Sequence, residues 1–148
     1  MEMNQLKILI RGAGDIASGI AYKLYKSRFK KLCMTEVARP LAVRREVAFC
    51  EAVHDGEKSV EGVTAAFAGS FDLIQEFWLK EKIPVLIDPR GDVISFLRPE
   101  VVVDAILAKK NPGTGMSDAD LVIGIGPGFY AGRDTHSVIE SKRGHFLG

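Results

Sequence analysis

The sequence predicts an α/β fold in which helices cover both faces of a mostly parallel sheet, a three-layer arrangement. Short apolar runs of strand length alternate with helical patterns along the chain. The first run ends in closely spaced glycines that lead directly into a helix. An acidic residue ends the second run, about 20 residues beyond those glycines. Together these three features are typical of a Rossmann-like domain that binds a dinucleotide.

The first strand and the loop after it carry the main signal. Residues 6–11 form the apolar run, and residues 12–17 supply the G-x-G-x-x-A pattern. Gly12 permits a tight turn, and Gly14 lets the backbone approach a pyrophosphate. Ala17 keeps the following helix close to the sheet.

The helix after the glycines is predicted from its apolar spacing. Ile16, Ile20 and Leu24 recur at the interval of one helical face. Its N-terminus offers N–H groups and partial positive charge to an anion. Asp15 suits that partial charge but would repel a close phosphate. We expect the cofactor to contact Gly12, Ala13, Gly14, Asp15, Ile16 and Ala17.

The second predicted strand, residues 32–35, ends in Glu36. A carboxylate at this position can accept hydrogen bonds from the ribose of a nucleotide, which favours NAD(H). Arg39, Arg44 and Arg45 follow closely and could meet a 2′-phosphate, so NADP stays open.

Residues 39–69 fit the alternating plan least well. An Asp55–Gly56 turn between residues 52–54 and 59–61 predicts a hairpin. Residues 63–67 predict a further strand. We interpret this region as an elaboration of the third strand–helix unit.

The remaining elements complete the sheet. Residues 71–79 predict a helix, and residues 85–87, 101–103 and 121–123 predict buried strands. Ligands of open α/β sheets lie beyond the carboxyl ends of the strands. The groups that follow these three strands, and that we expect at the same crevice, are Asp88, Asp104, Gly124, Gly126 and Gly128. Of these, Asp88 and the three glycines are candidate cofactor-binding residues, although the glycines also suit a plain turn.

Length and composition limit the remaining possibilities. The 148 residues (1–148) suit a single Rossmann-like domain with an ordinary globular composition, 47% apolar and 26% charged. The formal net charge of +1 gives no indication of a nucleic-acid surface. No run is long enough to span a membrane, and the polar start is unlike a signal peptide, so we expect a cytoplasmic protein. Cys33 and Cys50 are isolated and read as small core residues.

The sequence identifies no catalytic residue. Asp88, Asp104 and Lys109 could do acid–base work by their predicted position alone. Asp134 and His136, with the distant His145, form only a loose cluster without compact metal-ligand spacing, so we expect no metal site.

Several of these segments also match a known family. Together they resemble the YqeB-type accessory proteins of selenium-dependent molybdenum hydroxylases, a family similar to the Rossmann portion of XdhC-type molybdenum cofactor chaperones. The matching segments are residues 12–19, 35–36, 39–49, 101–105, 108–111, 121–129 and 140–145.

The resemblance implies a maturation factor that binds a nucleotide or the molybdenum cofactor and has a molybdenum hydroxylase as partner. It also implies a longer architecture, of which these 148 residues would be the N-terminal part. A small NAD(P)-dependent oxidoreductase and a non-enzymatic nucleotide or redox sensor remain alternatives. Pairing of two copies in a homodimer is also open.

Overall fold

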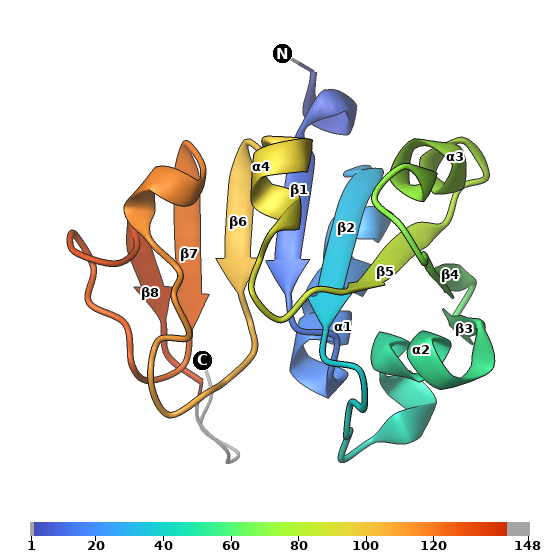
Figure 1. Cartoon of the computed structure of the whole chain (residues 1–148), viewed down its shortest axis with the longest axis horizontal. Coiled ribbons are helices and arrows are strands. Elements are labelled where there is room, and N and C mark those ends of the chain that lie inside the picture. Colours follow the sequence, from blue (N-terminus) through green and yellow to red (C-terminus); the bar gives the residue numbers. More distant parts are fainter. Residues whose placement is uncertain (1, 142–148) are drawn as a thin grey trace.

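The structure, a computed structural model, describes residues 2–141. Its centre is one eight-stranded sheet with the order β3-β4-β5-β2-β1-β6-β7-β8 (Figure 1). All neighbouring strands run parallel except β3 and β4. The strands are β1 (Lys7–Arg11), β2 (Lys31–Glu36), β3 (Glu57–Val60), β4 (Val63–Phe67), β5 (Ile83–Ile87), β6 (Val101–Asp104), β7 (Leu121–Ile125) and β8 (Ser137–Ile139). The helices are α1 (Asp15–Lys26), α2 (Ala52–Asp55), α3 (Leu73–Leu79) and α4 (Val93–Leu97).

The predicted α/β fold with a mostly parallel sheet and three layers is confirmed. The expected strands at residues 6–11, 32–35, 63–67, 85–87, 101–103 and 121–123 form, with ends shifted by up to two residues. The chain passes from β1 to β2 on one side, and β6 later pairs with the other side of β1. The carboxyl ends of β1, β2 and β6 therefore meet at a topological switch point, where open α/β sheets have their crevice.

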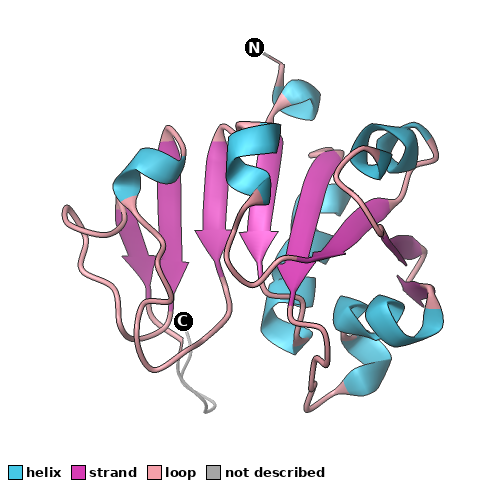
Figure 2. Cartoon of the chain, viewed as in Figure 1, coloured by secondary structure: helices cyan, strands magenta, loops and turns pink. Residues whose placement is uncertain are grey.

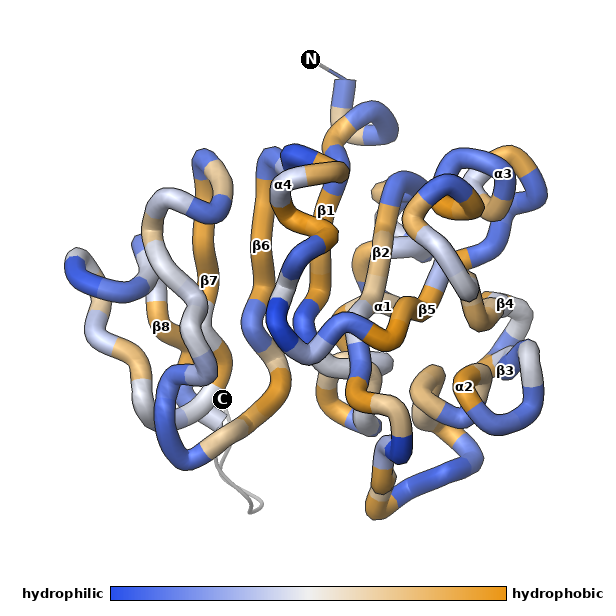
Figure 3. The backbone as a smooth tube through the Cα atoms, viewed as in Figure 1, coloured by the Kyte–Doolittle hydropathy of each residue, from blue (hydrophilic) through white to orange (hydrophobic). Residues whose placement is uncertain are grey.

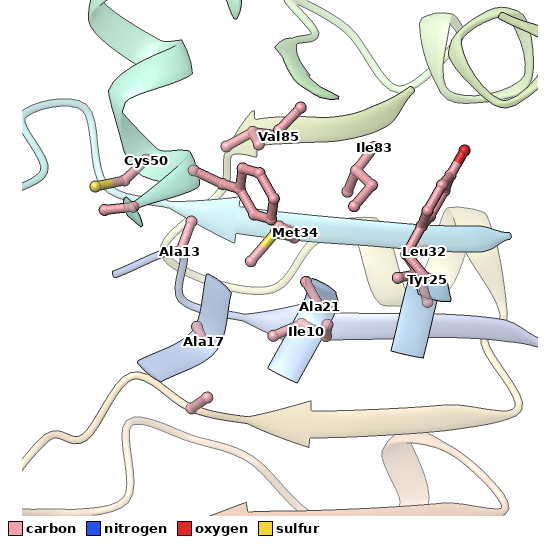
Figure 4. Close-up of a cluster of buried hydrophobic side chains, with 14 of the residues drawn as sticks. Ile10, Ala13, Ala17, Ala21, Tyr25, Leu32, Met34, Cys50, Ile83 and Val85 are labelled. Carbon is pink, nitrogen blue, oxygen red and sulfur yellow. The ribbon is translucent and has the colours of Figure 1, made fainter. Parts of the chain in front are cut away.

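Apolar side chains fill both faces of the sheet, because alternate residues of a strand point to opposite faces. On one face, Ile10 and Met34 pack against Ala17 and Ala21 of α1 (Figure 4). On the other, Leu9 and neighbouring strand residues pack against α3 and α4. Figure 3 shows the result: the middle of the central strands is apolar, and polar residues gather at their ends.

The two halves of the sheet are covered unequally. Along the chain, helices α1, α2 and α3 connect strands of the half that contains β1 to β5. In the described connections from β6 to β7 and from β7 to β8, the only helical element is the short 3₁₀ turn Met116–Asp118 (Figure 2). Strand β8 is exposed at all three residues. Within residues 2–141, none of the helices combines the length and apolar character that crossing a bilayer needs.

The hairpin expected around Asp55–Gly56 is wrong in position. Residues 52–55 form α2, which ends at Gly56 with a φ of +88°. The hairpin lies one element later, where β3 and β4 pair across Glu61 and Gly62. Both of these residues have positive φ, +46° and +85°, which matches the type I′ turn that joins antiparallel strands. Gly56 instead follows the last residue of a helix, another position where glycine with a positive φ is common.

Candidate functional site

A cleft of about 560 Å³ opens at the carboxyl ends of β1, β2, β5 and β6. The loop after each of these four strands contributes to its walls. The lining residues that the sequence analysis had singled out as binding residues are Gly12, Gly14, Asp15, Ile16, Ala17, Glu36 and Asp88. The structure therefore brings seven of the predicted residues to one cleft.

The glycine loop is shaped by Gly12 and Gly14 in different ways. Gly12 has a φ of +101°, and a Cβ atom there would lie 2.9 Å from the carbonyl oxygen of Ala105. Its N–H donates to the carbonyl of Thr35 at 2.8 Å, which ties the loop to the end of β2. Gly14 has ordinary φ, and a Cβ added to it would meet no atom within 4 Å. A side chain at Gly14 would therefore enter open space beside the cleft.

Helix α1 begins at the cleft. Gly14 is its N-cap and supplies no side-chain cap. The first helical turn has N–H groups without intrahelical acceptors, and Asp15, Ile16 and Ala17 of that turn line the cleft. The turn thus offers hydrogen-bond donors and the positive end of the helix dipole to an anion. Asp15 places a carboxylate in the same turn, so an anion must bind to one side of it.

Glu36 has a role that its sequence position does not reveal. Its Oε1 accepts the N–H of Ala13 at 3.0 Å, and its Oε2 accepts the N–H of Val37 at 2.7 Å. The carboxylate therefore joins the glycine loop to the end of β2, while its side chain still lines the cleft. Ala13 itself is buried, and its N–H is already used by Glu36, so this residue supports the loop from beneath.

Asp88 directly follows β5 and Asp104 is the last residue of β6, and both accept backbone N–H groups. The two oxygens of Asp88 accept the N–H groups of Asp92 and Val93 at 2.9 and 2.8 Å, at the start of α4. Asp104 is fully buried and accepts the N–H of Ile106 at 3.2 Å. Lys109 is exposed outside the cleft lining. Of the three acid–base candidates, only Asp88 reaches the cleft wall.

Arg11 is a buried residue behind the cleft wall that the sequence analysis missed. It ends β1 and is only 2% exposed. Its Nη1 donates to the hydroxyl of Thr114 at 2.8 Å, and its Nη2 donates to the carbonyl of Pro89 at 3.1 Å. The Thr114 hydroxyl in turn donates to Asp104 at 2.6 Å. The signal that could have found it is a charged residue at an inward position of a buried strand, two residues after Leu9.

The second glycine loop lies outside the cleft lining. A Cβ at Gly124 would lie 2.5 Å from the ring of Phe129, and one at Gly128 would lie 3.2 Å from the backbone of residues 109–111. A Cβ at Gly126 would lie 2.9 Å from Leu107, which does line the cleft. Gly126 and Gly128 therefore permit close packing against the loop after β6, whereas Gly124 leaves room for the ring of Phe129.

The segment after β2 forms an apolar and basic wall. Leu41 and Val43 line the cleft yet are 96% and 81% exposed. Arg39 also lines it. Arg45 pairs with Glu51 at 2.9 Å, and this guanidinium lowers the pKa of the Glu51 carboxyl. Of the three arginines considered for a 2′-phosphate, Arg39 is therefore the one placed at the cleft.

The loose cluster near the C-terminus has structural contacts. Asp134 accepts the N–H of Tyr130 at 3.1 Å, and His136 Nδ1 accepts the N–H of Val122 at 2.9 Å. His145, together with the rest of the matching segment from residue 142 onward, lies outside the described residues. Among residues 2–141, His, Cys, Asp and Glu form no group of three that could hold a metal ion.

Both cysteines are buried free thiols, as expected of core residues. Burial is the main cause that raises the pKa of the Cys50 thiol to about 11 and the pKa of Cys33 still further. Both thiols are protonated near neutral pH, which makes them poor nucleophiles.

The strand order and the position of the cleft define an α/β protein of the Rossmann type, with its cleft at the topological switch point. Over 141 residues, 95% of the chain, the sequence is 51% identical to a curated protein of Escherichia coli (strain K12) named "Uncharacterized protein YqeB". This similarity supports a relationship between the chain and YqeB. The matched region is 26% of that relative, so the chain spans about a quarter of its length. No family model matches the chain.

Proposed function

We propose that this chain is the nucleotide-binding part of an accessory factor for the maturation of a selenium-dependent molybdenum hydroxylase. Its cleft would bind a nucleotide or the molybdenum–pterin cofactor, with phosphates at the start of α1. The observation that carries the proposal is the cleft in which the glycine loop, the first turn of α1 and Glu36 come together.

The cleft fits such a ligand in size and chemistry. Its volume of about 560 Å³ is within the range of small-molecule sites. The N–H groups of the first turn of α1 suit a phosphate, and a side chain at Gly14 would compete for the same space. Val37, Leu41 and Ile106 supply apolar surface for a planar ring.

The ionisable groups of the cleft favour binding over proton transfer. Among the described residues that line the cleft, the ionisable ones are Asp15, Glu36, Arg39 and Asp88. Glu36 and Asp88 accept backbone N–H groups with both oxygens, so they act mainly as fixed acceptors. This arrangement supports the accessory role over the small NAD(P)-dependent oxidoreductase.

Calorimetric titration tests the proposal. Purified protein is titrated with NAD, NADH, NADP, AMP and a molybdopterin nucleotide, and Gly14→Asp is compared with Gly19→Asp. Gly19 is an exposed position of α1 outside the cleft lining, where an added Cβ also meets no atom within 4 Å, so it controls for the added charge. We expect one ligand to bind, and Gly14→Asp alone to abolish binding while circular dichroism stays unchanged.

The identity of the ligand separates the alternatives. Binding of the pterin without turnover supports the accessory role, and oxidation of bound NADH by a small substrate supports the oxidoreductase. Different affinities for NAD and NADH without turnover support a sensor. Equal binding of any ligand by Gly14→Asp and wild type would contradict the cleft as the site.

A further inference from the structure

Arg11 is buried without a charged partner. It is 2% exposed, and within residues 2–141 its guanidinium takes part in no ion pair within 4.0 Å. Its two hydrogen-bond partners, the Thr114 hydroxyl and the Pro89 carbonyl, are neutral. Its Nε has no partner among the described residues. A buried charge in this state is costly unless an opposite charge and further hydrogen bonds compensate it.

The nearest strand neighbour does not neutralise Arg11 directly. Asp104 lies opposite Arg11 in the β1–β6 register, so both side chains leave the same face of the sheet. Its Oδ2 accepts the Thr114 hydroxyl, and its Oδ1 accepts the N–H of Ile106. The hydroxyl of Thr114 therefore stands between the guanidinium and the carboxylate.

Thr114 belongs to a short strap, which we define as residues 112–115. The side chain of Asn111 accepts the N–H groups of Gly113 and Thr114 and donates to the Thr114 carbonyl, so the turn is held together internally. Apart from bonds to Asn111 and Asp118, the hydrogen bonds between the strap and the rest of the described chain all involve the Thr114 hydroxyl. One side chain thus fastens the strap over Arg11.

The strap and the Pro89 loop separate Arg11 from the cleft. Pro112 of the strap and Pro89 both line the cleft, and Pro89 is itself a hydrogen-bond partner of Arg11. Arg11 also directly precedes the glycine loop. The guanidinium leaves the same face of the sheet as Leu9 and lies near Gly91, so lifting of the strap would open it to the side of the cleft that Pro89 and Pro112 line.

We propose that Arg11 is an anion-binding residue of the cleft, covered by the strap until a phosphate or pyrophosphate group displaces the Thr114 hydroxyl. The inference rests on the proposed function, because it assigns a residue to the anionic part of the ligand. Guanidinium donors form charge-assisted hydrogen bonds with phosphate oxygens, and the donors open to an anion here are Nε and the Nη1 that the Thr114 hydroxyl would release. The anion would form the direct ion pair that Arg11 does not make among the described residues.

The test uses inorganic pyrophosphate as the probe and the full chain as protein. NMR follows the side-chain Nε–H signal of Arg11 in the wild type during the titration, which requires no substitution. We expect this signal to shift at saturation. An unmoved signal while pyrophosphate binds, or no binding of pyrophosphate at all, would overturn the proposal.

The proposal predicts that two substitutions change the affinity for pyrophosphate in opposite directions. Arg11→Gln should raise the Kd for pyrophosphate at least about tenfold, because it removes a charged donor. Thr114→Val should lower the Kd by about two- to tenfold, because it removes the hydroxyl with which the anion competes. A purely structural network predicts lower stability for Thr114→Val and no gain in affinity, and that result would overturn the proposal.

Controls separate this proposal from that of the cleft. Arg90→Gln, an exposed arginine on the loop next to Pro89, makes the same change in net charge and should leave the Kd unchanged. If nucleotides bind in a manner sensitive to Gly14→Asp but indifferent to Arg11→Gln, the cleft proposal stands and the Arg11 proposal fails. If Arg11→Gln does not fold, the NMR signal and Thr114→Val still decide.

Discussion

At the scale of single residues, Glu36 joins two parts of the cleft wall, because its carboxylate accepts N–H groups from both Ala13 and Val37. An acid that follows the second strand is commonly read as a ribose ligand. In this chain the same acid also fixes the loop that would hold the phosphates. Its loss should therefore affect stability as well as binding.

Glu36→Ala should lower the free energy of unfolding by about 1–3 kcal/mol, because two N–H groups lose their acceptor. Glu36→Gln should lower it less, since an amide oxygen can still accept one of them. Urea denaturation measures both. Equal stability of Glu36→Ala and wild type would show that water replaces the carboxylate without cost.

The two loop glycines should respond differently to alanine. Gly12→Ala combines a positive φ with a 2.9 Å approach of Cβ to the Ala105 carbonyl, so it should cost about 1–3 kcal/mol or more. Gly14→Ala has ordinary φ and open space around Cβ, so it should change stability by less than about 1 kcal/mol. Thermal unfolding of the pair measures the difference. Equal losses would contradict the loop geometry.

Cys50 makes stability depend on pH in the alkaline range. Burial, with Glu36 and Glu51 nearby, raises the pKa of its thiol from 9.0 to about 11 in the folded state. The unfolded chain therefore loses this proton first, and the stabilisation, complete below pH 9, is lost as pH rises toward 11. Cys50→Ala should flatten the slope of unfolding free energy against pH in this range by up to about 1.4 kcal/mol per pH unit. An unchanged slope would contradict a buried, protonated thiol.

At the scale of elements, the segment from residue 48 to 51 is held against the glycine loop by α1. Ser18 of α1 accepts the N–H of Phe49 at 2.7 Å and donates to the carbonyl of Ala13 at 3.1 Å. The N–H of Cys50 donates to the same carbonyl at 2.8 Å. The glycine loop, α1 and the segment before α2 therefore form one hydrogen-bonded unit beside the cleft.

Ser18→Ala should lower the free energy of unfolding by about 1–3 kcal/mol, because it leaves the buried N–H of Phe49 without an acceptor. Ser27→Ala is the matched control, since the Ser27 hydroxyl bonds the carbonyl of Lys23 on the exposed end of the same helix. It should change stability by less than about 0.5 kcal/mol. Denaturation of both variants in urea tests the difference, and equal effects would contradict the role of Ser18.

The elements that could be predicted are those with a strong local pattern. The strands of the parallel sheet are continuous apolar runs, and α1 has a clear apolar face after the glycines. The position of the hairpin could not be predicted, because Asp55–Gly56 has the standard hairpin sequence but ends a helix, whereas the turn forms at Glu61–Gly62, which lacks that sequence. Helix α4 was also missed, since it is only five residues long.

At the scale of the whole molecule, the crevice could be predicted in outline and its chemistry only in part. Because parallel strands place their carboxyl ends at one edge of the sheet, Gly14, Glu36 and Asp88 could be predicted to lie together, and all three line the cleft. Arg11 and Thr114 meet only in the folded structure, because 103 residues separate them in the chain. No local pattern reports such a contact. The homodimer and the hydroxylase partner stay predictions.

The most direct test of the account is to map a nucleotide onto the folded chain by ¹H–¹⁵N NMR during titration with AMP and NADH. The account predicts that the amide signals of Asp15, Ile16 and Ala17 shift together with that of Val37, and that Gly14→Asp abolishes these shifts. Shifts confined to residues outside the cleft, or no shift with either nucleotide or with a molybdopterin nucleotide, would contradict it.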